Sequence, residues 1–522
     1  MKTNDLLSST VFAALAVIAG CGGEDAADTA NGGSGGTGGD GGATSTPTGG
    51  GGGGIDTGGP GGGGPGGAGP GGTTTGGGSG GGSAPSCKAV WSRSFKGDIT
   101  QQFITGLIPD DKGDIVVCGY FEGTMDTGAG ELTSEASDMV LVKLDSAGNQ
   151  VWTRLLGGPE NQYGQVVSDG EGGLILTGQM EGSMDLGAGT LTSEGAEDAF
   201  IARFDADGKL LWNKRFGGPG HQSAGQARLD AKGDIVVIGR FEETIDLGGG
   251  PLTSAGNIDG YVAKFDLQGN HLWSKSFGDG SQQVLGSMDV DSAGNILLTG
   301  MFVGAMDFGG GPITTAGGFD VFVAKLDPDG GHVWSQRYGD SQIQTAAAVV
   351  VGPSDNVFVT GTFQGVIDFG GGQMLADPGL LGDMFVVELD AAGKHVQSHG
   401  VGGDAQRIPY AMALDEDGSP VVTGQFTGTL DVGGATLTST SQGDYDAFVF
   451  KLDPAGKPAF AGRFGDAKMQ VGEAVALAAP GQPILGGGFD GVIDFGAGPL
   501  ENAPHDSPVD FDFFITRLDC NP

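Results

Sequence analysis

Basic residues are scarce in this sequence. Lys and Arg together number 25 among the 522 residues, against 64 Asp and Glu, so the formal net charge is −39. Such a chain repels phosphate groups, and neither nucleic acid nor an anionic lipid headgroup is expected as a partner. The same charge favours solubility.

Residue types that carry out catalysis are also few. The chain has 6 His and 4 Cys. Between residues 87 and 520 there is no H-E-x-x-H, C-x-x-C or G-x-S-x-G motif, so the common zinc and nucleophile signatures are absent there. With so many carboxylates, some pairs fall at a glycosidase-like distance by chance, so acidity is no sign of hydrolysis. No catalytic residue is predicted.

Helical periodicity is missing as well. The sequence instead shows short segments with a two-residue period, separated by turns rich in Gly, Asp and Asn. The stretch from Asp291 to Gly339 and the residues just before it hold four such segments, at 287–291, 295–302, 320–327 and 332–338. They predict a small four-stranded antiparallel sheet that is apolar on both faces and must be covered on both sides.

This unit recurs seven times, about every 61 residues. The Asp of an (M/I/L)-D-x-G step stands at Asp126, Asp185, Asp246, Asp307, Asp368, Asp431 and Asp494. A second Asp stands at Asp138, Asp198, Asp259, Asp320, Asp383, Asp446 and Asp512. Seven four-stranded sheets arranged radially form a β-propeller, so residues 87–522 are predicted to be an all-β, seven-bladed propeller. The residues between the second and third strands of each blade predict an extra hairpin.

The two chain ends predict how the ring closes. The strand around Trp91 aligns with the fourth strands that contain Trp152, Trp212, Trp273 and Trp334, whereas the last strand aligns with a third strand. The N-terminal strand should therefore complete the last blade. By the same alignment Cys87 and Cys520 flank one missing hairpin turn, so we predict a disulfide between them, with two unpaired thiols as the alternative. Cys118 is interpreted as an inert buried thiol.

The first 86 residues predict export and anchoring. Residues 1–20 form a short apolar leader, and Ile18–Ala19–Gly20–Cys21 is similar to the bacterial lipobox, which implies cleavage before Cys21 and acylation of that residue. Residues 21–86 are then the lipidated Cys and a Gly-rich tether, which is too poor in apolar residues to fold. We expect an exported protein of the bacterial cell envelope, at the outer membrane or the cell surface, with the anchor as its one membrane contact. An ordinary secreted protein and an uncleaved anchor are the alternatives.

Polar residues near the predicted channel are the candidates for ligand binding. Arg228 and Asp289 fall on inner strands of adjacent blades, where an ion pair is expected and solvated lining is the alternative to a ligand site. Each loop that leads into an inner strand carries a Gln, which suits sugar or peptide recognition but equally suits hydrogen bonds between the loops of neighbouring blades, the interpretation favoured here; these are Gln102, Gln162, Gln222, Gln282, Gln342, Gln406 and Gln470. Residues found in one blade alone are expected on the same face: His221, Arg407, Tyr410, Glu473 and His505.

The repeated Asp residues have two interpretations. At strand ends and turns their carboxylates accept backbone N–H bonds, which makes them structural. Some pairs could instead bind Ca²⁺, although no D-x-D-x-D-G-x₅-E loop is present. The structural interpretation is favoured. No cofactor is predicted, with calcium as the alternative.

The units G-N-I-L-L-T-G-M-F and D-V-F-V-A-K-L-D-P-D-G-G-H-V-W resemble the bacterial β-propeller repeat family often called SBBP, and are similar to the delta-60 repeats. The resemblance implies an exported or surface protein and transfers no catalytic residue. The D-x-x-G-x-x-x-W segments also resemble sialidase Asp boxes and quinoprotein blades, but Arg is too scarce for the sialidase cluster and quinoprotein propellers usually have eight blades.

Together these features predict a monomeric, lipid-anchored propeller that serves as a non-catalytic binding or scaffold module for an extracellular glycan or protein. The alternative is a carbohydrate-active or quinone-dependent enzyme whose site lies at the channel mouth. Fold by itself does not decide between these hypotheses.

Overall fold

The computed structural model describes residues 87–520, apart from residues 188, 257, 378–381, 442 and 503–510. The predicted leader, the lipidated Cys21, the tether and His505 therefore lie outside the described residues. In the part of the chain that is described, no helix is long and apolar enough to cross a membrane.

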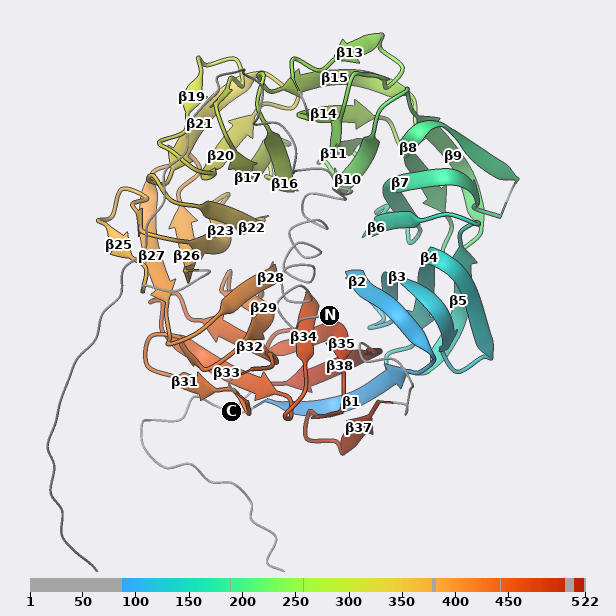
Figure 1. Ribbon diagram of the computed structural model, residues 1–522, viewed down its shortest axis with the longest axis vertical. Helices are drawn as coiled ribbons and strands as arrows, with labels where there is room; N and C mark the ends of the chain where they lie inside the picture. The colour runs from blue at the N-terminus through green and yellow to red at the C-terminus, as the bar shows by residue number, and fades with distance from the viewer. Residues whose placement is uncertain are drawn as a thin grey trace, which may run out of the picture. The chain divides into compact units, whose positions relative to one another are not determined.

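Seven four-stranded antiparallel sheets form a ring, which confirms the predicted propeller (Figure 1). We number the blades along the chain and their strands from the centre outward. Blade 1 holds β2 (Ile99–Pro109), β3 (Ile115–Asp126), β4 (Glu131–Leu144) and β5 (Gln150–Leu156); blade 2, β6 (Gln162–Ser168), β7 (Leu174–Asp185), β8 (Thr190–Phe204) and β9 (Leu210–Phe216); blade 3, β10 (Gln222–Leu229), β11 (Ile235–Phe241), β14 (Asp259–Phe265) and β15 (His271–Phe277); blade 4, β16 (Gln283–Val290), β17 (Ile296–Phe302), β20 (Asp320–Leu326) and β21 (His332–Tyr338).

The remaining three blades follow the same plan. Blade 5 holds β22 (Gln344–Val351), β23 (Val357–Phe363), β26 (Asp383–Leu389) and β27 (His395–Val401); blade 6, β28 (Arg407–Leu414), β29 (Pro420–Phe426), β32 (Asp446–Leu452) and β33 (Pro458–Phe464); blade 7, β34 (Gln470–Ala479), β35 (Gln482–Phe489), β38 (Asp512–Asp519) and β1 (Lys88–Phe95).

The extra hairpin between the second and third strands is present in every blade. In blades 3 to 7 it is a separate two-stranded sheet: β12 (Thr244–Asp246) with β13 (Pro251–Thr253), β18 (Ala305–Met306) with β19 (Ile313–Thr314), β24 (Val366–Ile367) with β25 (Met374–Leu375), β30 (Thr429–Asp431) with β31 (Thr436–Thr438), and β36 (Val492–Asp494) with β37 (Pro499–Glu501). In blades 1 and 2 it is the continuation of the long second and third strands.

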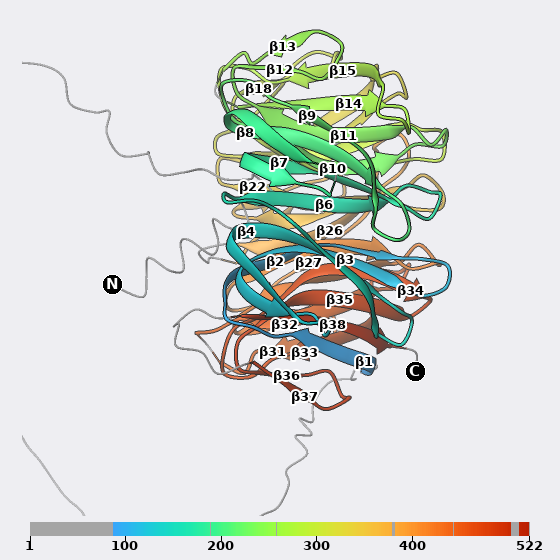
Figure 2. The same cartoon turned by 90° about the vertical axis from the view of Figure 1, so that its right-hand side faces the viewer.

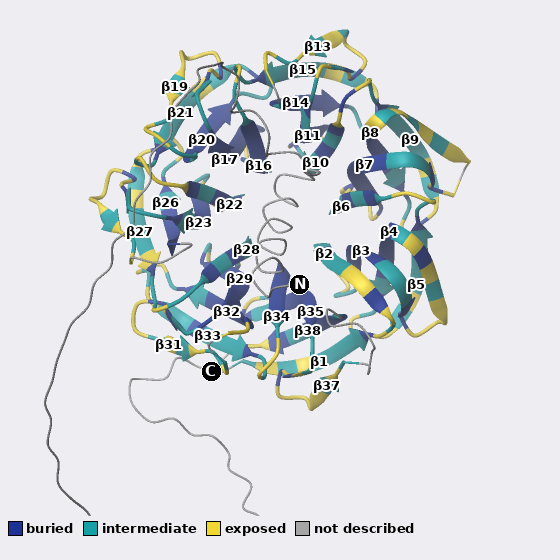
Figure 3. Cartoon of the chain, viewed as in Figure 1, coloured by how far each residue is buried: buried dark blue, intermediate teal, exposed yellow. Residues whose placement is uncertain are grey.

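The core lies between blades rather than inside any one of them. Val321 and Val323 of blade 4, for example, are fully buried against Val357 and Phe385 of blade 5. Figure 3 shows the buried residues on the inner strands and the exposed ones toward the rim. Since burial of each such side chain contributes about 1.5 to 3 kcal/mol, a blade depends on both neighbours for its stability.

A tryptophan on the fourth strand connects each of five blades to the next. The indole Nε1 of Trp273 donates to the carbonyl of Pro328, 3.2 Å away, in the turn before the fourth strand of the following blade. The ring also covers Gly330, whose φ of +75° favours glycine and whose added Cβ would lie 2.9 Å from the ring. Equivalent bonds of 3.1 to 3.3 Å are made by Trp91, Trp152, Trp212 and Trp334.

The ring closes as predicted. Strand β1 pairs antiparallel with β38, with Trp91 opposite Arg517 and Phe95 opposite Phe513. Figures 1 and 2 both show β1, in blue, beside β38, in red. The first strand of the described chain therefore supplies the fourth strand of blade 7.

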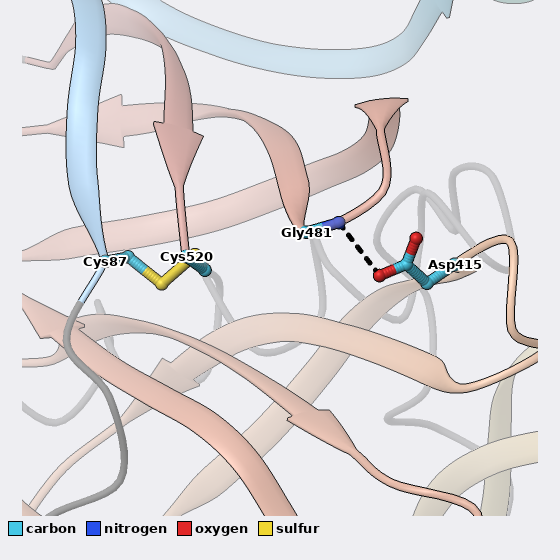
Figure 4. Close-up of a disulfide and its surroundings, with 4 residues drawn as sticks. All are labelled: Cys87, Asp415, Gly481 and Cys520. Atoms are coloured by element: carbon cyan, nitrogen blue, oxygen red, sulfur yellow. Dashed lines mark hydrogen bonds between the residues drawn. A yellow bond between two sulfur atoms is a disulfide. The ribbon is translucent and has the colours of Figure 1, made fainter. Parts of the chain in front are cut away.

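The disulfide between Cys87 and Cys520 is present at this seam, with the two Cα atoms 4.1 Å apart. Its surroundings are shown in Figure 4: the amide of Gly481, in the first turn of blade 7, donates to Asp415 of blade 6 over 3.0 Å. The backbone amide of Cys520 donates to the carbonyl of Gly481 over 2.9 Å. The bond thus stands in place of the missing turn and is joined to the neighbouring blade.

The seam also explains why blade 6 has Phe460 where five other blades have Trp. Phe460 is 2% exposed and packs in one cluster with Cys520 and Cys87. Because the turn that would accept an indole hydrogen bond is replaced by the disulfide, a purely apolar ring fits there. Cys118, the remaining described cysteine, is buried, and burial raises the pKa of its thiol to about 12, as expected for an unreactive group.

Replacing Cys87 by serine is predicted to lower the thermal midpoint under non-reducing conditions. The chain-entropy model gives a loss of at most about 5 to 6 kcal/mol for so long a loop. The matched control is Cys118→Thr, which removes the free thiol but keeps the disulfide. Thermal unfolding of both variants measures the effect, and an unchanged midpoint in Cys87→Ser would show that the bond contributes nothing.

Candidate functional site

The first strand of most blades contains a β-bulge, and the bulge decides what faces the channel. The register shifts between Ile104 and Gly106 in blade 1, and at the matching point of blades 3 to 7, whereas blade 2 is regular. A bulge leaves its extra residue unpaired and re-aims its side chain. The residues at this position, from blade 1 on and without blade 2, are Thr105, Gly225, Gly286, Ala347, Tyr410 and Glu473.

Blades 6 and 7 therefore break the symmetry of the channel. Tyr410 and Glu473 are the two large side chains at a position that is otherwise small. Both line a cavity of about 420 Å³ to which the first strands of all seven blades contribute. The opposite part of the wall includes Gln226, Arg228 and Ser287. One side of the cavity is thus polar, and the other is lined by small residues such as Ala411 and Ala474, among which Tyr410 and Glu473 are the exceptions.

Glu473 is the buried acid of this cavity. Only 7% of the residue is exposed, and its Oε2 accepts a hydrogen bond of 2.7 Å from the amide of Ile104 in blade 1. Among the described residues Oε1 has no hydrogen-bond partner. Burial raises the pKa of this carboxyl well above its ordinary value, against the smaller opposite effect of the Ile104 amide. Burial and the nearby Glu473 likewise raise the pKa of Tyr410.

Four aromatic rings lie in a row beside Glu473. The ring of Tyr410 packs edge-on against that of Phe103, with 6.1 Å between the ring centroids. Phe103 stacks on Tyr120, also with a centroid distance of 6.1 Å. Tyr120 in turn meets Tyr163 edge-on at 4.8 Å. The row runs from blade 6 past blade 7 to blades 1 and 2, and its Phe103 and Tyr410 line the cavity. The sequence offered a signal for it, since Phe103 and Tyr163 both follow the loop Gln of their blades.

The predicted ion pair between Arg228 and Asp289 is present, with Nε and Oδ1 3.3 Å apart. The other carboxylate oxygen of Asp289 accepts from the amide of Val351 over 2.8 Å. Next to it, Gln226 accepts from the hydroxyl of Ser287 and from a backbone amide of the same strand. These bonds connect the inner strands of blades 3, 4 and 5 and hold that side of the channel in one arrangement.

The loop glutamines are occupied by hydrogen bonds. Gln470 is fully buried; its Nε2 donates to Asp466 and to the carbonyl of Asp490, each over 2.8 Å, and its Oε1 accepts from the amide of Asp466. Gln162 and Gln222 close their loops in a similar way. These bonds join the entry loop of a blade to another loop of the same blade, not to a loop of a neighbouring blade as expected. Ligand binding by these amides stays a prediction.

The predicted equivalence of the seven glutamines needs a correction. In blades 4 and 5 the buried amide is Gln283 or Gln344, one and two residues after Gln282 and Gln342. In blade 6 Arg407, directly after Gln406, takes the position and forms a buried ion pair with Asp383. The loops differ in length by one or two residues, so alignment on the nearest Gln selected the wrong residue. In blade 1 the position is that of Gln102, opposite Phe121.

Of the other residues found in a single blade, His221 lies 3.3 Å from Glu197, between Nδ1 and Oε2. Burial raises the pKa of Glu197, and His221 is the main group that opposes this shift. Neither residue lines the channel cavity. The single-blade residues therefore separate into the channel pair Tyr410 and Glu473 and the loop residues His221 and Arg407.

The repeated Asp residues bind backbone amides. Asp307 accepts from Gly309 and Gly311 over 2.7 and 3.0 Å, and Asp320 accepts from Ala316 and pairs with Arg337, both over 2.8 Å. Within the described residues, no group of three or more His, Cys, Asp or Glu could hold a metal ion. The structural interpretation thus accounts for both Asp series, and calcium binding gains no support from them.

Comparison with known proteins does not show the family of this chain. No family model matches the chain, so the resemblance to SBBP repeats stays a prediction. Regulatory protein FlaEY of Caulobacter vibrioides is 30% identical over 183 residues, which cover 33% of this chain and only 18% of that protein.

Two solved structures illustrate the likeness in fold. The calcium-binding protein regucalcin from Agrobacterium tumefaciens is 13% identical, with a TM-score of 0.29 over 63% of this chain and 86% of that one. The PQQ-bound aldose sugar dehydrogenase from Streptomyces coelicolor is 12% identical, with a TM-score of 0.33 over 84% of this chain and 99% of that one. At such scores neither likeness bears on the activity of this chain.

The raised pKa of Glu473 predicts a pH-dependent effect of Glu473→Gln on stability. The folded chain keeps this carboxyl protonated to a higher pH than the unfolded chain, so the stability it contributes is complete below its ordinary pKa and is lost as pH rises toward the folded pKa. Glutamine has no such loss. The free energy of unfolding of the variant, relative to wild type, should therefore rise from pH 5 to pH 8.

Denaturant unfolding across this pH range measures the difference. Glu501→Gln, a change of the same charge at an exposed position of blade 7, is the control and should run parallel to wild type. A pH-independent difference between Glu473→Gln and wild type would mean that Glu473 ionises normally.

Proposed function

We propose that this protein is an exported, lipid-anchored β-propeller that binds an extracellular glycan or protein without altering it chemically. The lipobox-like segment at Cys21, the Gly-rich tether and the resemblance to SBBP repeats support the export and the anchor. A disulfide at the ring seam fits the same assignment, because such bonds persist outside the reducing cytosol. As a flexible coil the tether would reach about 45 Å, which suits display of a monomer at the outer membrane or the cell surface.

The channel cavity is the observation that supports binding. Its volume of about 420 Å³ falls within the range of small-ligand sites, and it combines ring faces, amides and one buried acid. Along the wall of blades 3 to 5, Gln226 and Ser287 are already fixed by hydrogen bonds between neighbouring strands. Side chains held in place before a ligand arrives lose little entropy on binding, which favours recognition.

A carbohydrate-active enzyme is the second candidate, and one observation favours it. Glu473 has the raised pKa that a general acid needs near neutral pH. Glycosidases use a second carboxylate. In the part of the chain that is described, Glu473 is the one Asp or Glu that lines this cavity, and Asp289, which is paired with the lining residue Arg228, does not line it. A quinone-dependent reaction has no comparable observation in its favour among the described residues.

Two measurements on the full chain test the proposal. In a bacterial host the wild-type protein should sediment with membranes, and the Cys21→Ser variant should be soluble, because the variant cannot be acylated at that position. Equal partition of the two would contradict the anchor.

The released variant is then applied to an array of glycans and peptidoglycan fragments and to a panel of envelope proteins. We expect retention of at least one probe, with the mass of that probe unchanged after incubation. A shortened glycan would establish the enzyme instead, and no retained probe would overturn the binding assignment.

A further inference from the structure

The buried carboxyl group of Glu473 indicates the chemical class of the ligand. Glu473 is 7% exposed and lines the cavity, and its Oε2 accepts a hydrogen bond from the Ile104 amide. Its Oε1 remains available to accept a hydrogen bond from a ligand in the cavity. A buried acid without a cationic partner is unfavourable when ionised. Within the described residues no Lys, Arg or His pairs with Glu473, so a positive group brought by a ligand would supply what the fold leaves out.

The cavity surroundings indicate the rest of such a ligand. Phe103 and Tyr410 present aromatic rings beside the acid, and aromatic faces attract both ammonium groups and the C–H face of a sugar. Gln165 of blade 2 and Gln226 of blade 3 also line the cavity, and the Nε2 of each can donate to a hydroxyl group. The Oε1 of Gln165 can accept as well, whereas that of Gln226 already accepts from Ser287 and Met288. Carboxylate, ring face and amide together match the ammonium, ring hydrogens and hydroxyls of one amino sugar.

We propose that the channel between blades 6, 7 and 1 binds an amino sugar with a free ammonium group, which forms an ion pair with Glu473. This rests on the proposed binding function and specifies its ligand class. A lysine side chain carries the same ammonium, but it offers no hydroxyls to the amides of Gln165 and Gln226. The cavity favours the sugar over the peptide for that reason.

Binding of this ligand should be coupled to a proton. Tyr410 is the titratable side chain that interacts electrostatically with Glu473. On the wall of blades 3 and 4, the opposite charges of Arg228 and Asp289 balance each other in an ion pair. Burial raises the pKa of Glu473 and so favours its protonated form before binding, whereas the ammonium ion favours its ionised form. The net change is R–NH₃⁺ plus Glu473–COOH giving the ion pair and one proton released to the buffer.

Titration calorimetry of the soluble Cys21→Ser protein with glucosamine and N-acetylglucosamine tests the inference. The two probes differ in the acylation of one nitrogen, which removes the positive charge. Glucosamine should bind at least about tenfold more tightly, since a hydrogen bond to a charged group contributes at least about 1.5 kcal/mol. In two buffers of different ionisation heat, its binding should release up to about one proton.

Two variants and one further amine complete the design. Glu473→Gln still accepts from Ile104, so the fold is kept, but the preference for glucosamine and the proton release should both disappear. Glu501→Gln, with the same change of charge, should bind like its parent. Nα-acetyl-lysine amide should bind at least about tenfold more weakly than glucosamine, as it lacks the hydroxyls.

The outcomes separate this inference from the function on which it rests. Equal affinity for the two sugars, an undiminished preference in Glu473→Gln, or lysine amide binding as well as glucosamine would overturn the amino-sugar site. If another glycan or a protein still binds in the array, the proposed function stands without it. If neither sugar binds and the array is also empty, both fall.

Discussion

The contact of each blade with the turn of the next is the constraint on which the structure depends. Every sheet is apolar on both faces, so a blade without two neighbours would expose the side chains that make up its core. The indole of Trp273 on the turn of the following blade shows how the sequence fixes this contact, with one hydrogen bond and one glycine under the ring. In a closed ring the first and last blades must also contact each other, so the two ends of the chain have to be joined.

The seam within blade 7, where β1 pairs with β38, is where the ring is closed. The chain ends meet in one sheet, the missing turn is replaced by the bond between Cys87 and Cys520, and Phe460 fills the place of the usual tryptophan. These three changes are connected, because each follows from the absence of a single hairpin. The channel residue Glu473 comes from blade 7, which contains the seam, and Tyr410 comes from the neighbouring blade 6, so the wall of these two blades differs from the rest of the ring.

Much of this could be predicted from the sequence, for a physical reason. The seven repeats adopt the same local structure, so the positions of Trp91 and of the two cysteines could be inferred by alignment with the other copies. The Arg228–Asp289 pair followed from strand alternation alone. The equivalence of Gln406 failed because the loops before the inner strands vary in length, and a Gln nearby is easily taken for the one that is buried.

The bulges were the other feature beyond the reach of the pattern. The repeat spacing shows that Tyr410 and Glu473 are equivalent, since they are 63 residues apart like Asp431 and Asp494. The sequence does not show that a bulge falls at this position in both strands. The aromatic row through Phe103 depends on contacts between blades 6 and 1, which are not neighbours in the ring. Such contacts depend on how small the intervening residues are, and only the three-dimensional arrangement shows this.

Hydrogen exchange of the oxidised and the selectively reduced protein tests the central claim most directly, namely that the chain ends and their disulfide hold the ring closed. The amides of β1 and β38 should lose protection first on reduction, followed by those of the neighbouring blades 6 and 1, while blades 3 and 4 stay protected longest. Loss of protection that is uniform around the ring, or that begins far from blade 7, would contradict it.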